Sequence, residues 1–225
     1  MKSLLQTVIN ADSGHYILVL LLLFLLSSGS IYAQNDKETT LVVGSYKAAP
    51  NQQDSFKVYI KDSKWVCVEY QGMCKIRETL QLSDNVLCAK KDKITELIEA
   101  LVYLKEKATE WNGILETRNM GSYEKEYKEV SFPRLDLYVK VNNENYHLWS
   151  KHYIKKASFI KNNNPYKIVL YIKGSYEINH EQALMMYVDS LLELNEAEIN
   201  QLILVLQDAA KLCHEGADID NLLTE

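Results

Sequence analysis

The chain has 225 residues, of which 47% are hydrophobic and 24% charged, and its formal net charge is −5. These ordinary globular values exclude an extended disordered chain. The acidic balance, together with the export predicted below, argues against a nucleic-acid partner, because the phosphate backbone binds basic surfaces.

The first expected element is a secretory signal. An apolar run from Tyr16 to Leu26 precedes small and polar residues and then Ala33. An apolar core of about 7–15 residues before a small residue is typical of a cleaved signal. We therefore expect residues 1–33 to be removed and the rest to be periplasmic or secreted, with no stable membrane span. The alternative is an N-terminally membrane-anchored protein, although a spanning helix needs about 20 apolar residues.

After this signal, the sequence predicts antiparallel strands followed by a helix. Apolar, β-branched runs such as "SFKVYI" and "KWVCVEY" alternate with turn residues, which is typical of strands. "DKITELIEALVYLKEKATEW" then places apolar residues three and four apart, which predicts an amphipathic helix. Asp92 is its expected N-cap and Gly113 its expected end. Residues 114–127 are polar and are interpreted as a linker.

The second half repeats this order. Strand-like runs resume at residue 128, and the last of them leads into a helix from about Glu196 to Glu215. Asn195 and Glu198 form an N-x-x-E capping box, which marks the helix start. At an offset of 105 residues, the two strand-to-helix segments share six identities, most of them apolar.

These elements indicate an α+β protein, mainly antiparallel sheet, with two long amphipathic helices packed on it. The repeat indicates either a duplicated strands-then-helix unit or chance similarity between two amphipathic helices. The predicted organisation is a signal at residues 1–33, a first unit at 34–117 and a second at 118–225. Together the two units are expected to form one compact domain.

Four cysteines remain after signal removal: Cys67, Cys74, Cys88 and Cys213. An exported chain with four cysteines allows two disulfides in three connectivities. "CVEYQGMC" could be a hairpin in which Cys67 faces Cys74, so a Cys67–Cys74 disulfide is the candidate pairing. Four buried free thiols are the alternative.

The familiar catalytic patterns are missing from the sequence. His180 and His214 open "HEQAL" and "HEGAD", but Leu184 and Asp218 stand where a zinc-protease helix needs its second histidine. There is also no nucleophile elbow and no glycine-rich phosphate loop. The sequence therefore predicts no catalytic residue, cofactor or metal site. Asp136, Glu78 and Glu129 lie in predicted strands and are the candidate carboxylates for the rival function, a carbohydrate-directed hydrolase.

Charge segregation is the sharper feature of the second half. Residues 145–176 hold six lysines and no acidic residue, whereas residues 177–225 hold eleven acidic residues and one lysine. Such a basic, aromatic surface suits an anionic polysaccharide, a lipid headgroup or an acidic protein. The plain alternative is a solvated, lysine-rich hairpin. The candidate binding residues are Lys151, Lys155, Lys156, Lys161, Lys167, Tyr153, Tyr166 and Trp149.

The sequence thus favours an exported, non-enzymatic binding or accessory protein of the periplasm or cell surface. A hydrolase is the rival from another class. A structural subunit that assembles through an open strand edge is the third hypothesis.

Overall fold

The computed structural model describes residues 39–47, 55–76, 79–141, 144–148, 153–162, 165–179 and 184–214. At residues 76, 141, 144–148, 153, 174–179 and 184–189 it describes the backbone alone. Thr39–Glu225 forms one compact unit, and the division into units at residues 117 and 118 stays a prediction.

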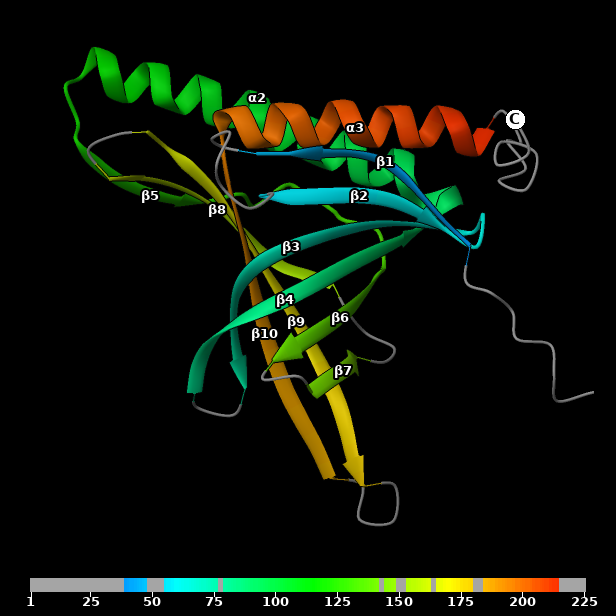
Figure 1. Cartoon of the computed structure of the whole chain (residues 1–225). Helices are drawn as coiled ribbons and strands as arrows, with labels where there is room; N and C mark the ends of the chain where they lie inside the picture. Colours follow the sequence, from blue (N-terminus) through cyan, green and yellow to red (C-terminus); the bar gives the residue numbers. More distant parts are fainter. Residues whose placement is uncertain are drawn as a thin grey trace, which may run out of the picture. The chain divides into compact units, whose positions relative to one another are not determined.

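Ten described strands form one antiparallel sheet (Figure 1). They are β1 Thr40–Tyr46, β2 Phe56–Lys61, β3 Trp65–Ile76, β4 Thr79–Lys90, β5 Ser122–Glu126, β6 Leu135–Val141, β7 Glu144–Leu148, β8 Tyr153–Asn162, β9 Lys167–Asn179 and β10 Leu184–Asn195. Eight of them follow the order β5-β8-β9-β10-β3-β4-β6-β7, while β1 pairs with β2, and β2 pairs with β3.

Side chains alternate between two faces of the sheet, as the pleat requires. On β3, Val68 and Tyr70 are buried in the hydrophobic core, whereas Glu69 and Gln71, which alternate with them, are exposed. We call the face that shares this core with the helices the inner face, and the opposite one the outer face. Because residues directly opposite each other on paired strands share a face, the strand register shows on which face each side chain lies.

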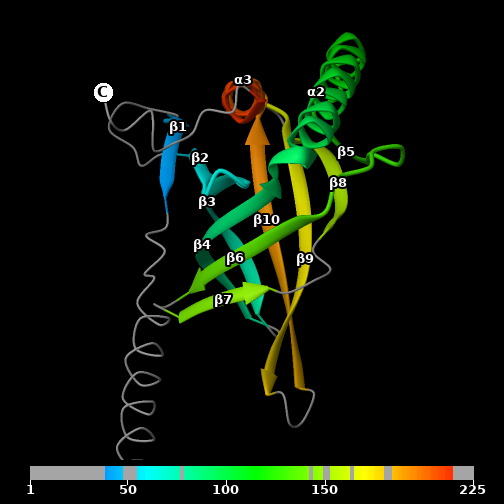
Figure 2. The ribbon, with the colours of Figure 1, turned by 90° about the vertical axis from the view of Figure 1, so that its right-hand side faces the viewer.

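Two α-helices cover one end of the inner face (Figure 1). The helix α2 (Ile94–Thr117) and the helix α3 (Glu196–His214) pack against each other at one end of the sheet (Figures 1 and 2). Helix α3 contacts β1, β2 and β10, and α2 contacts β4 and β9. Their buried leucines and isoleucines join the same core as the inner-face strand residues. Each such side chain contributes about 1.5–3 kcal/mol through its burial. The α+β class with a mainly antiparallel sheet is thereby confirmed.

The ends of α2 differ from their prediction. Asp92 is not the cap, because a short 3-10 turn η1 (Lys91–Lys93) precedes the helix, and Lys93 occupies the N-cap position without a side-chain hydrogen bond. The helix also continues through Gly113 to Thr117, with Leu115 buried beyond the glycine. The predicted linker at 114–127 was therefore wrong, since it holds the last turn of α2 and the strand β5.

The start of α3 confirms the capping box. The amide of Glu198 donates to Asn195 Oδ1 at 2.9 Å, and the amide of Asn195 donates to Glu198 Oε2 at 2.9 Å. Two amides that have no partner within the helix are thus satisfied reciprocally. Because Asn195 is also the last residue of β10, the cap fixes where the strand turns into the helix.

Replacing Asn195 by alanine should therefore lower the free energy of unfolding by about 1 kcal/mol, the usual cost of a lost N-cap. Chemical denaturation of the mature chain measures this change. Gln207→Ala, at an exposed position within α3, is the matched control and should change stability by less than about 0.5 kcal/mol. Equal effects of the two substitutions would show that the cap contributes nothing.

In the part of the chain that the structure describes, neither helix is long and apolar enough to cross a membrane. The apolar run at residues 16–26 lies outside the described residues.

Candidate functional site

The sheet forks at one edge of β3. Strand β4 pairs with the whole of β3, from Trp65 to Ile76, and so occupies its other edge. Strand β2 pairs with β3 only as far as Tyr70. Strand β10 then takes over the same edge from Met73 onward. Two strands that share one edge of β3 must therefore separate beside Gln71 and Gly72.

Gly72 allows β10 to approach β3 closely at this fork. A Cβ atom built on Gly72 would lie 2.6 Å from the backbone oxygen of Leu191 in β10, and 3.1 Å from both Asn85 Nδ2 and the Tyr70 ring. Its φ is outside the left-handed region, so the glycine is required for space and not for its backbone conformation. The sheet can fork here because no side chain separates the two strands.

A cleft of about 370 Å³ opens at the fork. Phe56 and Tyr70, which are opposite each other in β2 and β3, also line it, but their side chains point to the inner face. Both are buried in the core. The remaining lining side chains are polar: Lys47, Lys57, Glu69, Gln71 and Asp84.

The register places these polar groups side by side on the outer face. Lys57 of β2 is opposite Glu69 of β3, and Gln71 of β3 is opposite Asp84 of β4. None of these four side chains forms an ion pair or a hydrogen bond with another described residue. The cleft therefore presents a cation, two carboxylates and an amide whose hydrogen-bonding capacity is open to a ligand.

A buried polar network lies on the inner face beside the cleft. The Tyr70 hydroxyl is 3.0 Å from Ser190 Oγ of β10. The single hydroxyl proton of Ser83 lies between two acceptors, the Gly72 carbonyl oxygen at 3.2 Å and Asn85 Oδ1 at 3.0 Å. All of these side chains are buried, and their hydrogen bonds link β3 both to β4 and to β10. The network thus stabilises both arms of the fork.

Burial disfavours the charged forms of Tyr70 and Cys74 on the inner face. It raises the pKa of the Tyr70 hydroxyl far above its usual value, although the hydrogen bond to Ser190 opposes the shift. It also raises the pKa of the Cys74 thiol, with Ser83 opposing. A thiol nucleophile needs a lowered pKa, so Cys74 is not prepared for catalysis.

The described lysines of the predicted basic surface do not lie together on one face. Lys156 lies on the outer face, where it contacts Glu124 at 3.7 Å and Glu126 at 3.8 Å, with its Nζ 5.3 Å from the centre of the Tyr171 ring. Lys167 pairs with Glu193 at 2.8 Å, also on the outer face.

Lys161 lies on the opposite, inner face. It is buried against α2 and donates to Asn112 Oδ1 at 2.7 Å, with Glu116 at 3.5 Å. Lys155 is exposed at a β-bulge. These four lysines are therefore divided between two faces, and three of them form ion pairs with nearby glutamates.

Tyr166 is the one predicted aromatic member of that surface whose side chain is described. Tyr166 is buried in the core, with its ring 5.4 Å from that of Phe159. The side chain of Tyr153 lies outside the described residues, as do Trp149 and Lys151.

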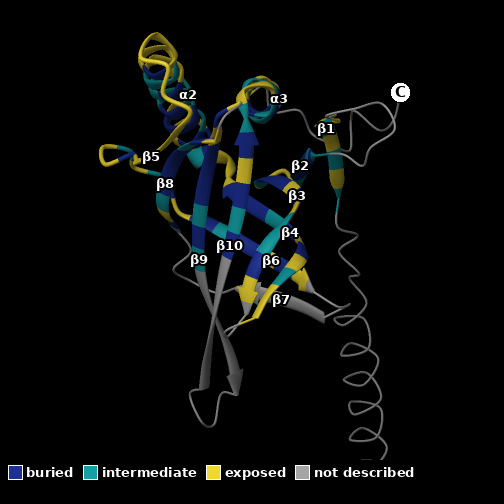
Figure 3. Ribbon diagram, turned by 90° about the vertical axis from the view of Figure 1, so that its left-hand side faces the viewer, coloured by how far each residue is buried: buried dark blue, intermediate teal, exposed yellow. Residues whose placement is uncertain are grey.

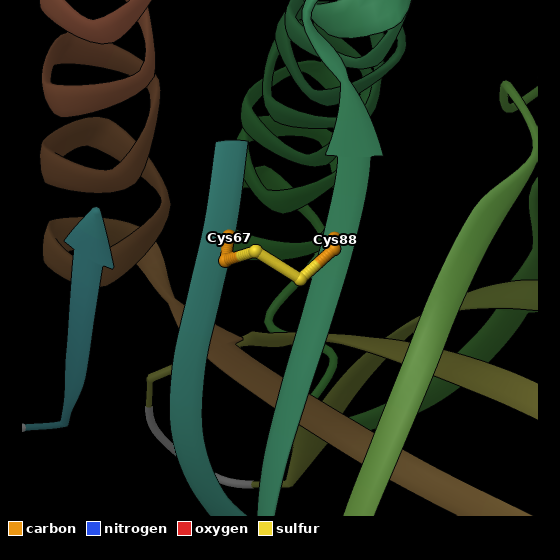
Figure 4. The surroundings of a disulfide bond; sticks show 2 residues. All are labelled: Cys67 and Cys88. Carbon is orange, nitrogen blue, oxygen red and sulfur yellow. A yellow bond between two sulfur atoms is a disulfide. The ribbon is translucent and has the colours of Figure 1, made fainter. Parts of the chain in front are cut away.

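The disulfide differs from the candidate pairing predicted from the sequence. Cys67 of β3 is bonded to Cys88 of β4, directly opposite it, with their Cα atoms 4.1 Å apart (Figure 4). Cys74 is a buried free thiol and Cys213 a half-buried one. The Cys67–Cys74 pairing was wrong because "CVEYQGMC" belongs to one continuous strand and not to a hairpin. Seven residues apart on that strand, Cys67 and Cys74 point to opposite faces.

The candidate carboxylates predicted from the sequence do not meet. Asp136 is on the outer face of β6, opposite Cys88. Glu129 is in the loop after β5, where it accepts a hydrogen bond from the Tyr103 hydroxyl at 3.4 Å. Glu78 lies outside the described residues. The carboxylates that do share a cleft are Glu69 and Asp84, which no sequence pattern indicated, because only the β3–β4 register makes them neighbours.

Among the described side chains, no three or more histidine, cysteine, aspartate or glutamate residues lie close enough to hold a metal ion. The chain shows no significant match to a protein-family model, to a curated protein or to a solved structure. A function for the fork cleft can therefore be inferred only from the residues that line it.

Proposed function

We propose that this chain is an exported, non-enzymatic binding or accessory protein that holds a polar ligand in the fork cleft. The observation that carries the proposal is the convergence of Lys57, Glu69, Gln71 and Asp84 on one cleft without partners among the described residues. A concave site with a few convergent polar groups is typical of a ligand-binding pocket.

The lining indicates the kind of ligand. Lys57 attracts an anionic or acceptor group, while Glu69 and Asp84 attract a cationic or donor group. We therefore expect a small molecule that carries both donors and acceptors, such as a short peptide or an amino sugar.

Two features favour binding over catalysis. The hydroxyl and thiol nearest the cleft have raised pKa values, which oppose their use as nucleophile or base. Glu69 and Asp84 are exposed, so water stays in contact with both carboxylates, whereas active sites usually exclude it.

Site-specific photo-crosslinking in the cells that export the protein would test this proposal. A photoreactive amino acid at Gln71 should capture a small molecule, whereas the same group at exposed Lys64, in the turn between β2 and β3, should not. Capture of the same species at both positions, or of none at Gln71, would contradict the proposed site.

Export is a separate part of the proposal. It is supported by the apolar run before Ala33, and the Cys67–Cys88 disulfide is compatible with it. The intact mass of the protein recovered from the exporting cells should correspond to a chain that begins at Gln34. A mass that retains residues 1–33 would favour the membrane-anchored alternative.

A carbohydrate-directed hydrolase is the second candidate, because Glu69 and Asp84 line one cleft. Asp84 is opposite Gln71, two residues from Glu69, so the two carboxylates are diagonal neighbours on one face. Glycosidases hold such a pair about 5–10 Å apart. Turnover of an oligosaccharide by the purified chain, abolished by Glu69→Gln or by Asp84→Asn, would establish this function in place of simple binding.

We also propose that the chain contains two related strands-then-helix units. Strands β4 and β10 each have 12 residues, begin 105 positions apart and lead into α2 and α3 respectively. Superposition of the two units in an experimental structure would test their kinship. Different strand orders within the two units would argue for chance similarity.

A further inference from the structure

A second, apolar groove lies at the far end of α2. It has a volume of about 210 Å³ and is bounded by the C-terminal turns of α2 and by the strand β5. Trp111, Ile114, Leu115 and Met120 supply most of its apolar lining, and Arg118 and Lys125 supply cations. The groove has no lining residue in common with the fork cleft.

Exposed apolar side chains gather at this groove. Eight large hydrophobic residues of the described chain are exposed, and three of them line it: Ile114 at 44%, Met120 at 40% and Tyr123 at 37%. Figure 3 shows the exposed end of α2 and the exposed strand β5 that carry them. Solvent-exposed apolar groups that cluster around a hollow mark a binding surface, whereas scattered ones need no explanation.

The acidic side chains near the groove contact lysines, whereas the groove's own two cations form no ion pair with a described residue. Glu116 pairs with Lys161, and Glu124 and Glu126 contact Lys156 on the outer face. Arg118 forms no ion pair with another described residue. Lys125 Nζ lies 4.1 Å from the centre of the Trp111 ring and forms no ion pair with another described residue.

We infer that this groove binds an anionic amphiphile with one acyl chain and a carboxylate head, as in a fatty acid. The acyl chain would lie on Ile114, Met120 and Tyr123, beside Trp111, where it removes exposed apolar surface from water. The carboxylate would be bound by Arg118 and Lys125, whose charges complement it. This site is additional to the proposed function and does not depend on it.

Trp111 provides a direct readout. Bromine quenches indole fluorescence on contact, so 11-bromoundecanoate should quench the mature chain saturably below its micelle concentration. Trp111→Phe should remove the saturable part of the quenching. The neutral analogue 11-bromoundecanol should bind at least about tenfold more weakly, since the loss of a charge-assisted contact is worth about 1.4 kcal/mol or more.

Variants then locate the site. Met120→Glu places a carboxylate at an exposed position in the groove and should weaken 11-bromoundecanoate binding about tenfold or more. Leu204→Glu, at a position 54% exposed on α3, is the matched control and should leave the affinity unchanged. Circular dichroism shows whether each variant is folded.

Three results would overturn the inference. These are the absence of saturable quenching in the unmodified chain, equal affinity for the acid and the alcohol, and an equal loss of affinity in Met120→Glu and Leu204→Glu. The first result would exclude the site, the second would exclude recognition of the anionic head group, and the third would place the binding elsewhere.

Discussion

Replacing Gly72 with alanine should lower the free energy of unfolding by about 3 kcal/mol, at the upper end of overpacking effects. The added methyl would lie 2.6 Å from the Leu191 backbone oxygen, well inside van der Waals contact. Backbone cannot rotate away as a flexible side chain does, so β10 must move off β3. That movement would also separate Tyr70 from Ser190, which are hydrogen-bonded across the fork.

Gly113→Ala is the matched control, because it adds the same methyl group where no atom lies within 4 Å. Gly113 is within α2, so alanine should stabilise the protein by about 0.5–1 kcal/mol through helix propensity. Urea denaturation of both variants measures the two effects. A Gly72→Ala protein as stable as the unmodified chain would show that β10 does not approach β3 as described.

Removing the Cys67–Cys88 disulfide should cost about 3 kcal/mol. The bond closes a loop with a sequence separation of 21 residues, and cross-links of this span restrict the unfolded chain by about that amount. Urea denaturation of the double variant Cys67→Ala, Cys88→Ala measures the loss. Cys213→Ala, which removes a half-buried thiol in no disulfide, should cost less.

Thiol titration in denaturant tests the pairing itself. The unreduced mature chain should show two reactive thiols, Cys74 and Cys213, and the reduced chain all four. Four thiols without reductant would contradict the disulfide. A Cys67–Cys74 peptide in a proteolytic digest would instead restore the pairing predicted from the sequence.

Local signals predicted the elements whose causes are local. The start of α3 was found because Asn195 and Glu198 satisfy each other's backbone amides within four residues. The α+β class was predicted correctly because several strand-like segments in succession are followed by a helical segment. The end of α2 was missed because Gly113 costs only about 1 kcal/mol in a helix, and burial of Leu115 beyond it offsets that cost.

The strand β3 could have been predicted better. The alternation of buried Val68 and Tyr70 with exposed Glu69 and Gln71 runs into Gly72 without a break in the strand. Gly72 resembled a turn residue, whereas its role is to admit β10 from more than 100 residues away. An odd spacing on one strand would already have excluded a Cys67–Cys74 bond.

No sequence pattern could have predicted the fork cleft. Lys57, Glu69 and Asp84 look like ordinary solvated strand residues, and only the pairing of β2, β3 and β4 makes them neighbours. The lysine-rich stretch resembled a site because its residues are close in sequence. Alternation along β8 then divided Lys156 from Lys161, on opposite faces of the sheet.

The central claim is that the fork cleft holds a polar ligand without transforming it. The most direct test is gentle purification of the mature chain from its own exporting cells, followed by native mass spectrometry. We expect a small molecule that stays bound to the unmodified chain, is released intact on denaturation, and is missing from the folded double variant Glu69→Lys, Asp84→Lys. Equal retention by the variant, or release of a molecule that the protein has chemically altered, would contradict this claim.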